Sequence, residues 1–236
     1  MRPMWTTCAA AAAAIAVSTG GFLLPRSAQA EEVPVQQEPM HTLRLETTRY
    51  RIYDVTVPVG EATLFHRHSA DNFAVYLSSS SILNERPDGT RVSASVVPGG
   101  VNFAAASSTA SYVHRVTTTG GDAFRNLTIE LLGEAAPTAT TRLPSGAGFA
   151  TIRESARGAA FRVELEPGAS VTLPTTAADA LLVCIKPATF VLSAGELQED
   201  RWVCETGQFR LVKAPSATRI SSPTPVPGAL VAFIFN

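Results

Sequence analysis

Two of the chain's four histidines lie two positions apart, in the stretch GEATLFHRHSADNF over residues 60–73. Successive strand residues point to opposite faces, so a strand here would place His66 and His68 on one face and Phe65 and Arg67 on the other. Neutral imidazole is a good ligand for zinc, copper, iron and nickel, which makes two neighbouring rings candidate metal ligands. The alternative is a pair of ordinary polar side chains on the solvent-facing side of a sheet.

The elements that must position these rings are predicted to be strands. Residues 44–134 contain alternating, β-branched and aromatic runs such as LRLETTRYRIYDVTV and FRNLTIELL, separated by turn signals such as RPDGT and TTTGGD. Residues 135–150 are small, polar and proline-bearing, as in a linker, and residues 151–236 repeat the order of the strands. No segment has a sustained helical period with caps. The pattern predicts an all-β chain with two sandwich-like units of about 100 residues each.

The composition and the first residues narrow the class of function. The formal net charge is −1 with no basic block, which argues against a nucleic-acid partner. Residues 1–30 combine an apolar run with a small-x-small ending, as in a secretory signal cleaved after Ala30, the alternative being a membrane anchor. No other stretch reaches about 18 apolar residues. We therefore expect a secreted or periplasmic protein with no membrane attachment after cleavage.

Export would change the meaning of the cysteines. Of the three in the sequence, Cys184 and Cys204 remain after cleavage, both in apolar runs that read as strands. In an oxidising compartment such a pair is a candidate disulfide. The alternative is two buried thiols that act as small hydrophobic side chains.

The segment after the cleavage site is polar and contains two prolines. We expect residues 31–43 to form a flexible N-terminal arm, unless they add a strand to a sheet edge. His41 lies in this arm and is expected to be solvated.

The two units resemble the cupin superfamily, whose small jelly-roll barrels (double-stranded β-helices) carry a metal inside. The family's first motif is Gly, five residues, His-x-His, three or four residues and Glu. Gly60, His66 and His68 match it, whereas Asn72 stands at the place of the glutamate. From the second motif, His114 in SYVH matches the histidine. The second unit contains no histidine, so the resemblance implies a two-barrel (bicupin) chain with a degenerate first motif and a metal-free second barrel.

The resemblance also implies a function. His66, His68 and His114 would bind a divalent metal in the first barrel, with iron, zinc, manganese, nickel and copper not distinguishable. A neutral ligand set leaves the charge of the ion uncancelled and favours a small anionic substrate on the metal. Cupins with three histidines and iron(II) include dioxygenases, so any enzyme here would be a metal-dependent oxidoreductase. The alternatives are a non-catalytic module that binds a small ligand and a structural cupin, with a homodimer as one arrangement.

Neighbouring strand positions predict the surroundings of the site. The candidates for the pocket lining are Asn72, Phe73, Val75, Phe103 and Tyr112. Each aromatic or aliphatic residue among them could equally belong to the core.

Overall fold

The computed structural model describes residues 32–107, 109–133, 148–173, 179–194, 199–213 and 217–236. Within these ranges the chain is built from strands, and its one helical element is the 3-10 turn η1 (Val35–Gln37). None of the described helical residues forms a helix that is long and apolar enough to cross a membrane. The expected signal over residues 1–30 and most of the expected linker over residues 135–150 lie outside the described residues.

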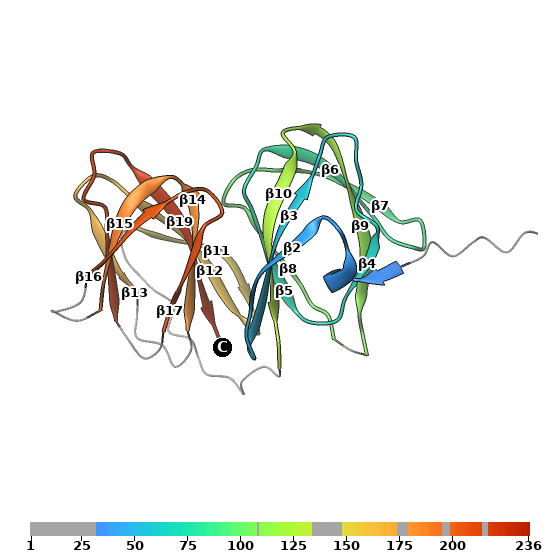
Figure 1. Ribbon diagram of the computed structural model, residues 1–236, viewed down its shortest axis with the longest axis horizontal. Helices are drawn as coiled ribbons and strands as arrows, with labels where there is room; N and C mark the ends of the chain where they lie inside the picture. The colour runs from blue at the N-terminus through green and yellow to red at the C-terminus, as the bar shows by residue number, and fades with distance from the viewer. Residues whose placement is uncertain (1–31, 108, 134–147, 174–178, 195–198, 214–216) are drawn as a thin grey trace, which may run out of the picture.

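The first barrel is made of two five-stranded sheets (Figure 1). One sheet contains, in spatial order, β1 (Glu32–Pro34), β4 (Phe65–His68), β9 (Tyr112–Gly121), β6 (Ser80–Glu85) and β7 (Arg91–Val96). The other contains β2 (His41–Glu46), β3 (Tyr50–Val57), β10 (Phe124–Leu131), β5 (Asn72–Tyr76) and β8 (Val101–Ala104). Strands that follow one another in the chain, such as β3 and β4, often lie in opposite sheets, as in a jelly roll.

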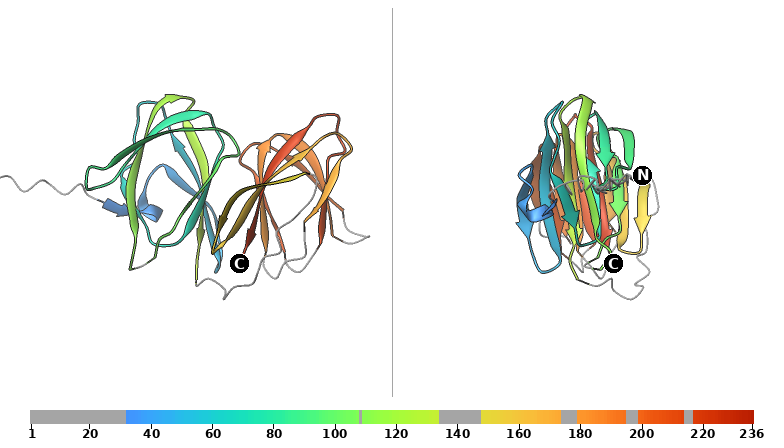
Figure 2. Two further views of the ribbon diagram at one scale, coloured as in Figure 1. Left: turned by 180° about the vertical axis from the view of Figure 1, so that it is seen from behind. Right: turned by 90° about the vertical axis from the view of Figure 1, so that its right-hand side faces the viewer.

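The second barrel repeats this arrangement. Its five-stranded sheet contains β11 (Phe149–Ser155), β12 (Gly158–Leu165), β19 (Gly228–Phe235), β14 (Ala180–Lys186) and β17 (Phe209–Val212). Its four-stranded sheet contains β13 (Ser170–Leu173), β18 (Thr218–Ser221), β15 (Ala188–Ala194) and β16 (Glu199–Cys204). The barrels stand side by side, as Figure 1 and the left view of Figure 2 show. The prediction of an all-β chain with two jelly-roll barrels is confirmed.

The barrels share a hydrophobic core where the β3–β10–β5 sheet packs against the β12–β19–β14 sheet. Phe73 and Val75 are completely buried in this core, and the ring of Phe73 lies 5.4 Å from that of Phe233 in β19. Phe103 packs against the same cluster. The prediction that Phe73, Val75 and Phe103 line the site is therefore wrong. Odd-numbered residues of β5 face the other barrel, whereas Asn72 and Ala74 face the interior of their own.

The interiors of the two barrels differ in chemistry. The second is filled by an apolar cluster that includes Phe161, Phe190 and Trp202. A disulfide between Cys184 and Cys204, whose Cα atoms are 6.1 Å apart, links its two sheets. The first barrel holds a smaller apolar cluster and leaves the remaining interior to histidine, asparagine and threonine. The first barrel is consequently the one with room for a ligand.

The N-terminal segment is part of the first barrel. Strand β1 pairs in parallel with β4, with Val33 opposite His66, and β2 pairs antiparallel with β3. Val35 is 1% exposed and belongs to the barrel's apolar cluster. The flexible arm expected over residues 31–43 is thus wrong for the described residues, and the alternative of a strand added at a sheet edge is what the structure shows. The burial of the apolar Val35 side chain in the barrel stabilises this segment against the barrel.

Candidate metal centre

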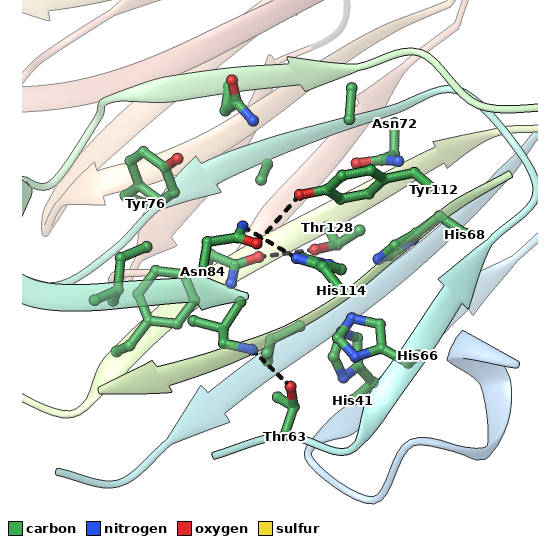
Figure 3. Close-up of a pocket in the computed structure, with 18 residues that line it drawn as sticks. His41, Thr63, His66, His68, Asn72, Tyr76, Asn84, Tyr112, His114 and Thr128 are labelled. Carbon is green, nitrogen blue, oxygen red and sulfur yellow. Dashed lines mark hydrogen bonds between the residues drawn. The ribbon is translucent and has the colours of Figure 1, made fainter. Parts of the chain in front are cut away.

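Four histidine rings gather inside the first barrel (Figure 3). His66 and His68 lie on one face of β4, as alternation predicts, and His114 stands opposite His66 on β9. The ring centroid of His66 is 5.1 Å from that of His68 and 4.5 Å from that of His114. His41 approaches from β2, with its ring 4.6 Å from that of His66. The four histidine side chains come from both sheets of the barrel and converge on one point.

His41 is the histidine of the cluster that sequence reasoning missed. Its ligand nitrogen and those of His66 and His68 all lie within 4.8 Å of one another, which suits three ligands of one ion. The side chain of His41 is 4% exposed, so the prediction of a solvated residue is wrong. The one available signal was Glu38, an acid three residues earlier that can pair with a histidine.

Glu38 fixes the orientation of the His41 ring. Its Oε2 atom lies 2.5 Å from Nδ1 of His41, and its carboxylate also accepts hydrogen bonds from the backbone N–H groups of Met40 (2.8 Å) and Leu64 (3.2 Å). Burial alone would raise the pKa of Glu38, but the hydrogen bond and charge of His41, with the two N–H groups, bring this pKa below its usual value. An ionised carboxylate on Nδ1–H leaves Nε2 of His41 free for a metal.

The ring of His66 is oriented by the main chain. Its Nδ1 lies 2.9 Å from the carbonyl oxygen of Leu64, which can only accept, so Nδ1 carries the proton. Nε2 is buried and has no hydrogen-bond partner among the described residues. Burial, followed by the neighbouring His41 and His68, lowers the pKa of His66 to about 3. A neutral ring with an unused buried lone pair is suited to a cation.

His68 lies beside a second buried carboxylate. Its Nδ1 is 3.4 Å from Oε1 of Glu130, and Oε2 of Glu130 accepts a 3.1 Å hydrogen bond from Arg51. Sequence reasoning missed Glu130. Alternation along β10 could have found it, since Ile129 and Leu131 face the shared core and Glu130 must face the other way.

His114 is held through a different contact. The side-chain amide of Asn84 is hydrogen-bonded to Nδ1 of His114 at 3.1 Å, and the hydroxyl of Tyr112 donates to Oδ1 of Asn84 at 3.3 Å (Figure 3). Nε2 of His114 is buried without a partner in the described part of the chain. Burial is the main cause of a pKa well below the usual value for histidine, with the neighbouring histidines acting in the same direction.

The rings border a small polar cavity of about 80 Å³. Besides the histidines, its polar lining consists of Thr63, Asn72, Tyr76, Asn84, Asn102, Tyr112, Asn126 and Thr128. Among the described residues no carboxylate, lysine or arginine lines it. A volume of this size holds roughly a handful of water molecules, or a ligand of a few non-hydrogen atoms. The neighbouring Asp71 points away, accepting a hydrogen bond from the N–H of Ala106.

Comparison with known proteins places the fold. No family model and no curated protein matches the sequence. Among solved structures, AerE from Microcystis aeruginosa superposes with a TM-score of 0.61 at 9% identity, covering 86% of this chain and 96% of that one. A cupin 2 conserved barrel domain protein from Leptotrichia buccalis gives a TM-score of 0.50 at 9% identity, covering 83% and 88%. The formate complex of Lactobacillus farciminis oxalate decarboxylase gives 0.54 at 9% identity, covering 83% and 85%.

The chain has a two-barrel cupin fold. Because the likeness spans most of both chains, it includes both barrels and not one alone. The cupin barrels differ here, since the three-histidine group lies in the first and the second is filled by apolar side chains.

Proposed function

We propose that this chain is an exported two-barrel cupin that binds a divalent transition metal in its first barrel and, through the metal, a small anionic ligand. The observation that carries the proposal is the cluster of four histidines. Nε2 of His66 and Nε2 of His114 are buried there with no partner among the described residues. Buried polar atoms are nearly always paired, so an orphaned set at one point calls for an absent partner.

The donor set fits a borderline metal such as iron, zinc, manganese, nickel or copper. His66 and His68 would hold the ion, with His114 as the third ligand that the cupin resemblance implies and His41 as the one that the structure adds. A bound ion of this kind supplies a Lewis acid and, for iron or manganese, a redox centre. The residues of the chain fix the ligand rings, exclude bulk water and shape the cavity.

Charge favours an anion as the ligand. The ion would meet only neutral imidazoles, and of the two nearby carboxylates Glu130 is already paired with Arg51. Glu38 is thus the one carboxylate beside the cluster without an arginine partner, and a divalent charge stays partly uncancelled. A positive side chain also lies near the cavity: the guanidinium of Arg86 is 5.3 Å from the ring centroid of Tyr112, which lines the cavity. The formate bound to the oxalate decarboxylase neighbour supports a small carboxylate.

Two functions remain for such a site. The first is a dioxygenase-like oxidoreductase acting on the small anion, as the resemblance implies. The second is a module that binds the anion without turnover, and the lack of a carboxylate base among the described lining residues favours it. Export is supported by the Cys184–Cys204 disulfide, since such bonds persist in oxidising compartments.

Metal analysis of protein purified from its export compartment tests the proposal. The wild type is expected to carry about one transition-metal ion per chain, and His66→Ala to lose it while keeping the fold. Arg67→Ala is the matched control, because Arg67 is the next residue on β4 and its side chain is exposed on the face opposite to the histidines. A wild-type protein without metal, even after loading, would overturn the proposal. Oxygen consumption with formate, oxalate or other small carboxylates then separates the oxidoreductase from the binding module.

A further inference from the structure

We propose that the anion bound in the first barrel is a short hydroxy monocarboxylate, and that Asn126 recognises its hydroxyl group. The inference rests on the proposed function and narrows the class of its ligand. It distinguishes that ligand from a dicarboxylate and from an unsubstituted carboxylate. The proposal is carried by the different chemistry of the two ends of the cavity.

The two ends of the cavity lie apart along strand β10. Asn126 and Glu130 both face the interior of the first barrel, because the odd-numbered residues between them pack in the shared core. Glu130 belongs to the histidine end, since its Oε1 lies 3.4 Å from Nδ1 of His68. Asn126 comes four residues earlier, which corresponds to about 13 Å along a strand. It stands opposite Tyr76, which Figure 3 shows on the far side of the cavity from His68.

The end beside Asn126 has apolar walls. Val55 lies directly opposite Asn126 on β3, and Phe124 is two residues before it on the same face of β10. Both line the cavity, together with Ile82 and Val116 of the same apolar cluster. A short carbon chain is stabilised against such walls, because its burial removes apolar surface from water.

A second charge is disfavoured at this end. None of the described residues that line the cavity is a lysine or an arginine, and the hydroxyl of Tyr76 stays neutral because burial raises its pKa. The charge of the ion is at the histidine end, where the first carboxylate binds. A second carboxylate beside Asn126 would be buried without a counter-charge, at a large cost in free energy. These walls therefore select a ligand with one carboxylate.

Asn126 adds one polar group to the apolar end. The residue is 4% exposed, and one atom of its amide is hydrogen-bonded to the hydroxyl of Thr128 at 2.8 Å. A hydroxyl can donate or accept, so Thr128 satisfies the amide in either orientation. In both orientations the other amide atom has no hydrogen-bond partner among the described residues.

A hydroxyl group on the ligand is the partner that meets this amide in either orientation. A methyl group at the same place would leave the buried amide unpaired, which costs free energy. A water molecule is the alternative partner. The two cases differ in the affinity that a ligand gains from a hydroxyl group, which can be measured.

Calorimetry on the Zn²⁺-loaded protein at pH 7 tests the proposal. The ligands are propanoate, 3-hydroxypropanoate and malonate, which share a three-carbon chain and end in a methyl, a hydroxyl and a carboxylate group. The wild type is expected to bind 3-hydroxypropanoate about tenfold more tightly than propanoate, because the hydroxyl pairs with the buried amide. Malonate is expected to bind more weakly than 3-hydroxypropanoate.

Two variants assign the preference to Asn126. Asn126→Leu replaces the amide with an apolar side chain of similar size, and Asn126→Ala removes it. Both are expected to bind 3-hydroxypropanoate and propanoate equally well while keeping the Zn²⁺ content of the wild type, which shows that the first barrel is folded. Asn236→Leu is the matched control, since the amide of Asn236 donates to the carbonyl oxygen of Ala156 in the second barrel. It is expected to keep the preference of the wild type.

Each failure has its own meaning. Equal affinities in the wild type would overturn the inference, since water alone would then pair with Asn126, and would leave the metal and anion site standing. A preference that persists in both Asn126 variants, or tighter binding of malonate than of 3-hydroxypropanoate, would also overturn it. Failure of the wild type to bind Zn²⁺, or to bind any of the three carboxylates, would instead overturn the proposed function.

Discussion

Single residues set how each histidine can act, because the partner of one ring nitrogen decides what the other can do. Glu38 and the carbonyl of Leu64 hold Nδ1–H of His41 and His66, whereas the side-chain amide of Asn84 lies 3.1 Å from Nδ1 of His114. All four rings are imidazoles in one cluster, yet their neighbours give them different chemistry. Glu38 and Leu64 are within three residues of the histidines that they contact, whereas Asn84 lies 30 residues before His114.

Removing the charge of Glu38 tests this control. Glu38→Gln keeps the shape of the side chain but replaces the ionised acceptor on Nδ1 of His41 with an amide, and metal affinity is expected to fall about 10- to 100-fold. A chelator-competition titration measures it. Glu164→Gln, an exposed acid on β12 of the second barrel, is the control. Equal affinity of Glu38→Gln and wild type would show that Glu38 does not orient a ligand.

The sequence predicts part of this residue-level organisation. Alternation in HRH places His66 and His68 together, and the spacing in the cupin motif points to His114. His41 could not be predicted in the same way, since the direction of its side chain depends on the register of β2 against β3, where His41 lies opposite Val55. An irregularity between Leu43 and Leu45 interrupts strict alternation along β2, so the pattern of the sequence does not identify the face that His41 occupies.

The strands show a second limit to what the sequence predicts. Runs of alternating and β-branched residues predict the strands, but not which face of a strand meets which barrel. In β5, both Asn72 and Phe73 are buried, the first beside the cavity and the second in the shared core. A strand covered on both faces lacks a solvent-facing polar side, so the sequence does not show that Phe73, Val75 and Phe103 face the shared core and not the cavity.

The disulfide acts at the scale of elements, because it joins β14 to β16 across the two sheets of the second barrel. Cys184→Ala/Cys204→Ala opens a loop with a sequence separation of 20, and the expected loss of stability is about 3 kcal/mol in the chain-entropy model. Urea denaturation measures it. Metal binding in the first barrel should be unchanged at temperatures where the variant is folded.

Thiol labelling provides the direct check on the same bond. The mature protein, denatured without reductant, should show no reactive thiol, and the reduced protein should show two. Two labelled thiols in the unreduced protein would contradict the bond.

The molecule as a whole is stabilised by two interiors and by the core between the barrels. Part of the interior of the first barrel is a polar cavity, whereas the interior of the second barrel and the shared core are apolar. The fold is therefore expected to unfold as one cooperative unit, with the histidine cluster as its most pH-sensitive part.

The metal-free protein should lose stability in acid. His66 has a pKa of about 3 in the folded protein against the usual histidine pKa of 6.5, so between these values the unfolded chain binds a proton that the folded chain does not. Its contribution is fully present above pH 6.5 and is lost as the pH falls toward 3, by about 1.4 kcal/mol per pH unit. His114 acts in the same direction. Denaturant titrations at pH 7, 6 and 5 measure the slope, which should be shallower in His66→Ala; an unchanged slope would contradict the assignment.

Strand β19 has a consequence for the order of events during synthesis. It lies between β12 and β14 at the centre of its sheet, although it follows both in the chain. All eight of its residues, GALVAFIF, are buried, and several pack in the shared core against the first barrel. Until β19 leaves the ribosome, β12 and β14 lack their common neighbour and the facing sheet of the first barrel lacks part of its cover. The sheet that contains β12 and β14 is thus completed only once β19 has been synthesised.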